Sequence, residues 1–181
     1  LPSNYDGENL TYTYTDLVIR KGERLDISAK EALEDMGPGD VFVKGANAIN
    51  YERDQAAVLI GHPTGGNVGL AIGPAMARRI CFLHPVGLEK SVSVDLVEVA
   101  EAINSDPEGK GPTLWVVPGP LFTEIEALDV LTGVEAIPAG AGGVGGAEGA
   151  VWLALFGTKQ ELDLAQNVIS SVRGEPTFTS A

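Results

Sequence analysis

The chain has 181 residues, 44% of them hydrophobic and 20% charged, which is an ordinary balance for a soluble globular protein. The net charge of −13, together with the lack of any lysine and arginine cluster longer than a pair, argues against a nucleic-acid partner. No stretch approaches the roughly 20 apolar residues of a membrane span. Leu1–Leu10 lacks the charged and apolar regions of a signal peptide, so the prediction is a cytoplasmic protein with no membrane partner.

The first half of the chain alternates short apolar runs with helical patterns. Leu10–Ile19 alternates threonine with tyrosine, as strands often do, and the glycine turn after it predicts a hairpin with Arg24–Ile27. Ser28 and Glu31 have the spacing of a capping box and predict a short helix. The strands and helices predicted after it are Asp40–Lys44, Ala56–Ile60, Val68–Arg79, Ile80–His84 and Asp95–Ile103. Because a proline inside a helix is costly, an alternative start of the helix within Val68–Arg79 is Pro74.

A polar segment divides the chain into two predicted domains. Asn104–Pro112 is rich in glycine and proline, which is typical of a linker, so we expect an α/β core domain at residues 1–106 and a subdomain at residues 112–181. The second part has the order β-α-β-β-α, which is most of a ferredoxin-like unit. Its predicted elements are Thr113–Val117, Leu121–Leu131, Val134–Pro138, Ala150–Phe156 and Lys159–Val172.

The order of these elements predicts an α/β fold. Strands that alternate with helices indicate a mostly parallel sheet flanked by helices, to which a smaller α+β ferredoxin-like subdomain is added. Within that sheet we expect three runs to be neighbouring strands: Asp40–Lys44, Ala56–Ile60 and Ile80–His84. In an open α/β sheet, small molecules bind at the carboxyl ends of the strands.

The first candidate binding segment is GANAIN, residues 45–50, which follows the strand ending at Lys44. Gly45 lets a ligand approach the backbone closely, while Asn47 and Asn50 can donate and accept hydrogen bonds. Lys44 can meet a phosphate or a carboxylate. The alternative interpretation is an asparagine-rich turn that only bends the chain, beside a solvated lysine.

The second candidate is the loop after Ala56–Ile60. Gly65, Gly66 and Asn67 lie near a helix start, where free backbone N–H groups favour an anion. His62 is a candidate general acid or base, because histidine titrates near neutrality. The alternatives are plain turn chemistry for the glycines and a structural hydrogen bond for the histidine.

Three further residues follow the next predicted strand or lie in it. Glu89 and Lys90 can face the same crevice as GANAIN, one as a base and one as a cation, or can simply be exposed charges. Cys81 lies in an apolar run and is predicted to be a core thiol. Two histidines 22 residues apart and one cysteine do not have metal-ligand spacing, so we expect no metal, and no motif indicates a cofactor.

VFVKGANAIN, residues 41–50, followed by a glycine pair, resembles the isomerase and CoA-transferase-like superfamily, whose strand ends in Gly-Ala-Asp before a glycine-rich segment. PVGLEKSV is similar to the Gly-Ile-Glu-Lys segment of lactate-utilisation proteins, which share that broad fold. The superfamily includes ribose-5-phosphate isomerase A, in which a ferredoxin-like subdomain joins an α/β core. Asn47 stands where these families have a functional aspartate, and Ala48 where the isomerase has a glutamate. An amide cannot accept a proton as a carboxylate base does.

These patterns predict a protein that binds a small anionic metabolite, either a sugar phosphate or a CoA-type ligand, at the carboxyl ends of the strands. One alternative is a sugar-phosphate isomerase or an acyl or CoA transferase that uses Glu89 or His62. The other is an oligomeric scaffold without a ligand, in which the partner is a second copy of the chain. The sequence leaves all three open.

Overall fold

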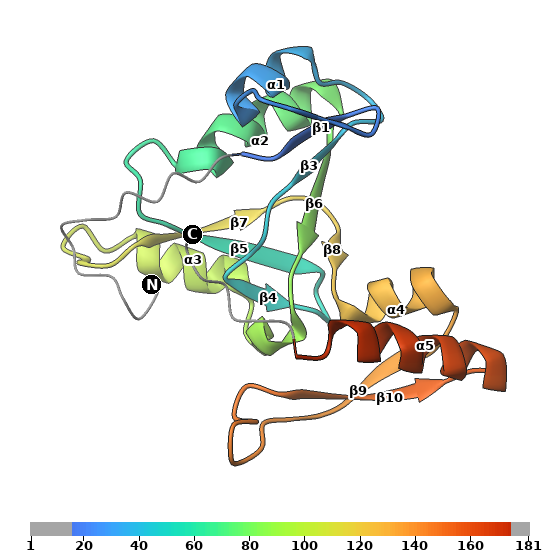
Figure 1. The fold of residues 1–181 in the computed structure, drawn as a ribbon. Coiled ribbons are helices and arrows are strands. Elements are labelled where there is room, and N and C mark those ends of the chain that lie inside the picture. Colours follow the sequence, from blue (N-terminus) through green and yellow to red (C-terminus); the bar gives the residue numbers. More distant parts are fainter. Residues whose placement is uncertain (1–15, 175–181) are drawn as a thin grey trace.

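The computed structural model describes residues 16–174 (Figure 1). It begins with β1 (Val18–Arg20) and β2 (Glu23–Leu25), two antiparallel strands whose pairing confirms the predicted hairpin. The earlier part of the predicted strand, residues 10–15, lies outside the described residues. The hairpin lies beside α1 in Figure 1, at the end of the molecule that also holds α2.

Helices α1 (Ala29–Asp35) and α2 (Gly66–Arg78) pack against each other, as Figure 1 shows. The predicted capping box at Ser28 forms and begins α1. Helix α2 contains Pro74 in its interior, and the preceding residue, Gly73, has no Cβ atom to crowd the proline ring. Neither these helices nor any other within residues 16–174 is long and apolar enough to cross a membrane.

A three-stranded parallel sheet joins distant parts of the chain. Its strands are β3 (Val41–Val43), β6 (Cys81–Pro85) and β8 (Leu121–Phe122), in the order β3-β6-β8. The rings of Phe42 and Phe82 stack between the first two strands, with their centroids 5.2 Å apart. Because the strands are parallel, the carboxyl ends of β3 and β6 lie next to each other.

A second three-stranded sheet is antiparallel. It has the order β4 (Ala48–Asn50), β5 (Gln55–Ile60) and β7 (Thr113–Val117). Helix α3 (Leu96–Asn104) covers one face of it, which confirms the helix predicted near Asp95–Ile103. The buried residues between the helix and this face are Ala57, Leu96, Ala100 and Leu114.

The C-terminal elements form a separate layer at one end of the molecule (Figure 1). Strands β9 (Glu135–Ala141) and β10 (Val151–Phe156) pair antiparallel, and α4 (Glu124–Thr132) and α5 (Lys159–Val172) lie on the same face of this hairpin. The predicted capping box at Thr158 forms and begins α5. The buried residues of this layer are Leu128, Val134, Ala136 and Ala165.

The prediction of a mostly parallel sheet flanked by helices is wrong. The described residues form four small sheets, and only β3-β6-β8 is parallel. The runs Asp40–Lys44 and Ile80–His84 do pair, but Ala56–Ile60 lies in the antiparallel sheet as β5. Its partner β4 comes from GANAIN, for which we expected a binding segment or an asparagine-rich turn and not a strand. A turn of residues 51–54 is enough to join the two strands, because antiparallel strands need only a short connection.

The ferredoxin-like arrangement is also wrong. Thr113–Val117, predicted as its first strand, pairs with β5 in the sheet that α3 covers. Leu121–Phe122, predicted as the start of a helix, pairs with β6 instead, and α4 begins at Glu124. The strands β9 and β10 therefore form a two-stranded sheet by themselves. The division of the chain into two domains, at residues 1–106 and 112–181, stays a prediction.

Cys81 is exposed, so the prediction of a core thiol is wrong. Successive side chains of a strand point to opposite faces. In β6, Phe82 and His84 are fully buried, and the residues between and before them are not. The apolar run around Cys81 predicted the strand correctly, but the side of the strand on which each residue lies depends on its non-local neighbours.

Candidate functional site

Two lysines meet where β3 and β6 end. Lys44 follows β3, and its Nζ donates to the carbonyl oxygen of Gly45 at 3.4 Å. Lys90 ends the short 3-10 helix η1 (Leu88–Lys90) after β6, and its Nζ donates to the carbonyl oxygen of Ala46 at 3.1 Å. The two ammonium groups therefore contact neighbouring residues of the loop that joins β3 to β4. We call Lys44 and Lys90 the lysine pair.

Within residues 16–174, neither Lys44 nor Lys90 forms an ion pair with a carboxylate. The ion pairs there join other side chains, namely Arg20 with Asp35, Arg53 with Asp95, and Lys159 with Asp163. Burial, and after it the nearby charge of Lys90, lowers the pKa of Lys44. Both effects disfavour the charged form of Lys44, whereas the negative charge of a bound anion would favour it.

His84 holds the backbone of Lys44 in place. Its ring is fully buried, with Nδ1 2.7 Å from the carbonyl oxygen of Lys44 and Nε2 3.0 Å from that of Pro118. Phe82 meets the ring edge-on, with their centroids 5.1 Å apart. The sequence assigned no role to His84, because its partners are backbone carbonyls far away along the chain. It ties the end of β3 to the segment between β7 and β8.

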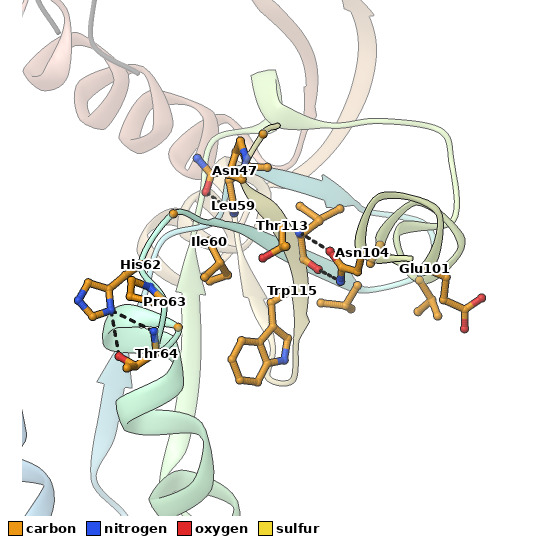
Figure 2. Close-up of a pocket in the computed structure, with 18 residues that line it drawn as sticks. Asn47, Leu59, Ile60, His62, Pro63, Thr64, Glu101, Asn104, Thr113 and Trp115 are labelled. Carbon is orange, nitrogen blue, oxygen red and sulfur yellow. Dashed lines mark hydrogen bonds between the residues drawn. The ribbon is translucent and has the colours of Figure 1, made fainter. Parts of the chain in front are cut away.

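A cavity of about 1490 Å³ lies between α3, the strands β5 and β7, and the loop that leads into α2 (Figure 2). Three predicted site residues line it together: Asn47, His62 and Gly65. Trp115 projects into it from β7, as Figure 2 shows. Apolar lining comes from Leu59, Ile60, Pro63 and Val97. We call this space the Trp115 cavity.

The glycine-rich loop makes room for Trp115, a residue that sequence reasoning missed. Gly65 and Gly66 have positive φ values of 82° and 55°, which favour glycine. A Cβ atom on Gly65 would lie only 2.9 Å from Cζ3 of Trp115, and one on Gly69 would overlap the carbonyl oxygen of Thr64. The sequence did contain a signal for this contact, namely two glycines four residues apart, Gly65 and Gly69. Residues with this spacing share one face of a helix, so a large side chain can pack closely there.

The two asparagines of GANAIN have different roles. Asn47 is exposed, and its Oδ1 accepts a hydrogen bond from the N–H of Leu59 at 3.0 Å, which prolongs the pairing of β4 with β5. Asn50 is buried; its Nδ2 donates to the carbonyl oxygen of Val94 at 2.8 Å, and its Oδ1 accepts from the N–H of Arg53 at 3.1 Å. Both polar atoms of the Asn50 side chain thus bond to the fold, whereas Nδ2 of Asn47 has no hydrogen-bond partner within residues 16–174.

The remaining predicted residues lie apart from the Trp115 cavity. Lys44 and Asn67 line a smaller cavity of about 680 Å³ beside β1, α1 and β3. Glu89 is exposed and is not among the lining residues of either cavity. His62, which does line the Trp115 cavity, is also exposed, with its Nδ1 2.9 Å from Oγ1 of Thr64. Along the part of the chain that the structure describes, no hydrogen bond joins Glu89 to His62.

Comparisons with family models, with curated proteins and with solved structures gave no match to this chain. The likeness to the isomerase and CoA-transferase-like superfamily therefore stays a prediction from its two short motifs. Within residues 16–174, histidine, cysteine, aspartate and glutamate side chains nowhere gather in a group of three that could hold a metal.

Proposed function

We propose that the protein binds a small anionic metabolite whose charged group is held by the lysine pair. The observation that carries the proposal is the convergence of two ammonium groups on the carbonyls of Gly45 and Ala46, with no carboxylate paired to either lysine in the described chain. The site lies at the carboxyl ends of the parallel strands β3 and β6, where α/β proteins commonly bind ligands.

Electrostatics supports this choice of ligand. A chain with a net charge of −13 repels anions overall, so an anion needs a local positive charge to bind. The lysine pair provides that charge. Because His84 holds the backbone of Lys44 in place, binding costs little conformational entropy of that backbone. An anion between the two lysines would also raise the pKa of Lys44, which burial and Lys90 lower.

The class of metabolite follows from the resemblance described above. Members of the isomerase and CoA-transferase-like superfamily act on sugar phosphates or CoA esters beside the equivalent strand, so these two ligand types are the first to test. A cytoplasmic location, which the composition favours, and self-association into a homo-oligomer belong to the same proposal.

Calorimetry tests the proposal directly. Ribose 5-phosphate and coenzyme A are titrated into the protein, with ribose as the uncharged control. Hydrogen bonds to charged groups are worth about 1.5–3 kcal/mol, so Lys44→Gln or Lys90→Gln should weaken binding by about 10-fold or more. Lys159→Gln is the matched control, because Lys159 is exposed and pairs with Asp163 on α5. Equal binding by wild type and both site variants, or no binding of any anion, would overturn the proposal.

A further inference from the structure

The Trp115 cavity contains a fixed aromatic platform. Trp115 is 37% exposed, and its Cζ3 packs close to Gly65 and Gly69 at the start of α2. The pairing of Trp115 with Val58 fixes its backbone in the centre of β7. One edge of the ring therefore packs against the start of α2, while more than a third of the residue stays exposed to the cavity.

The lining of the cavity selects against negative charge. Among the residues that line it, Glu101 has the one permanent charge, and the lysine pair is absent from the lining. Two donors remain available to a ligand. The Nε1–H of Trp115 has no hydrogen-bond partner within residues 16–174, and Nδ2 of Asn47 is likewise unused there. An occupant should therefore have acceptor atoms but no anionic group.

The edge of β7 is already occupied, which argues against an extended peptide as the occupant. The side chain of Asn104 accepts from the N–H of Leu114 at 3.0 Å and donates to its carbonyl oxygen at 2.8 Å. A peptide that added a strand beside β7 would need these same two backbone groups. A small molecule that lies on the tryptophan ring does not need them.

We propose that the Trp115 cavity is a second binding site, which takes a flat, uncharged heteroaromatic molecule stacked on Trp115. Every aromatic nitrogen heterocycle presents a π-face, and stacking on an aromatic side chain requires no particular substituent. Acceptor atoms at the edge of the stacked heterocycle then meet Nδ2 of Asn47. The Nε1–H of Trp115 lies in the plane of the indole, so it can donate only to a substituent that reaches past the edge of the tryptophan ring. This site does not depend on the lysine pair.

Nuclear magnetic resonance can test the site without any change to the residues that line it. The chain has two tryptophans, so a ¹⁵N-labelled sample gives two indole N–H signals, which Trp152→Phe assigns. Adenosine is the probe, and adenosine 5′-monophosphate adds a phosphate to the same ring. Adenosine should shift the Trp115 signal saturably and leave the Trp152 signal in place, because the Nε1–H of Trp152 already donates to Gly142. The monophosphate should bind at least five-fold more weakly.

Three outcomes would overturn the proposal: an unmoved Trp115 signal, equal shifts of both tryptophan signals, or equal affinity for the two probes. Equilibrium dialysis with adenosine gives a second measurement. Trp115→Leu should remove saturable binding, while the matched control Trp152→Phe, which changes another exposed tryptophan, should keep it. Should Trp115→Leu fail to fold, the comparison of the two signals in the wild-type protein still decides the question.

Discussion

The side-chain amide of Asn104 replaces a neighbouring strand beside Leu114. Its Oδ1 accepts from the N–H of Leu114, and its Nδ2 donates to the carbonyl oxygen of the same residue, at 3.0 and 2.8 Å. In an antiparallel pair, the N–H and C=O groups of successive residues point alternately toward the partner strand and away from it. Those of Leu114 point away from β5, toward Asn104. The last residue of α3 is thereby joined to the free edge of the sheet that forms the floor of the Trp115 cavity.

Replacement of Asn104 by alanine should lower the free energy of unfolding by about 1–3 kcal/mol, because it leaves two backbone groups of Leu114 without partners. Urea denaturation followed by circular dichroism measures the change. The matched control is Asn167→Ala on α5, an exposed asparagine, which should change the free energy by less than about 0.5 kcal/mol. Equal effects of the two substitutions would show that the bonds to Leu114 contribute no net stability.

Tyr51 makes the free energy of unfolding depend on pH in the alkaline range. Its hydroxyl donates to Oε1 of Glu126 at 2.6 Å, and burial together with this hydrogen bond raises the pKa of Tyr51 to about 12 from a reference value of 10.0. The folded state holds the proton more tightly than the unfolded state does. Its contribution to stability is therefore complete below pH 10 and is lost as the pH rises toward 12.

Tyr51→Phe should remove this dependence. Free energies of unfolding for wild type and variant, measured in urea between pH 9 and pH 12, should converge as the pH rises. The difference between the two proteins isolates Tyr51 from the lysines that titrate in the same range. A constant difference across this range would mean that Tyr51 has the same pKa in both states.

Local signals predicted the elements well, and non-local pairing explains the failures. The capping boxes at Ser28 and Thr158 begin α1 and α5 as predicted, because their hydrogen bonds lie within one turn of helix. Strand β5 pairs antiparallel with its neighbour β4 and with the distant β7, and the apolar pattern of its own residues suits a parallel or an antiparallel partner. The same holds for Thr113–Val117, whose apolar pattern suits either sheet equally well.

The candidate site shows the same division. Asn47, His62 and Gly65 were singled out from short motifs, and they do line one cavity. Trp115 was missed because it comes from a strand about fifty residues later, and its contact with Gly65 depends on the pairing of β5 with β7. The lysine pair was found residue by residue, although the position of Lys44 depends on a buried histidine that no motif marked.

Cys81 should react readily with a thiol reagent in the native protein. It is exposed on β6, and it is the only cysteine of the chain, so the reaction counts one thiol per molecule. Ellman's reagent should therefore give the same final absorbance with and without urea, and labelling of the folded protein should not wait for unfolding. A thiol that reacts only in urea would mean that Cys81 is covered in solution.

The glycines around the Trp115 cavity allow the sharpest comparison. A Cβ atom on Gly69 would overlap the carbonyl oxygen of Thr64, so Gly69→Ala must displace the loop before α2 and should lower the free energy of unfolding by about 1–3 kcal/mol. Gly61 lies in the same loop with open space around its Cβ position and no positive φ. Gly61→Ala should therefore raise stability by about 0.4–1 kcal/mol, because it restricts the unfolded chain.

Urea denaturation of the two variants side by side measures both changes under one set of conditions. Opposite signs are expected, although the two substitutions are chemically identical and only eight positions apart. A loss of stability in both variants would mean that the loop tolerates no added methyl group anywhere. An unchanged free energy of unfolding in Gly69→Ala would show that the loop before α2 moves freely. Trp115, which packs against this loop, would then not be a rigid platform.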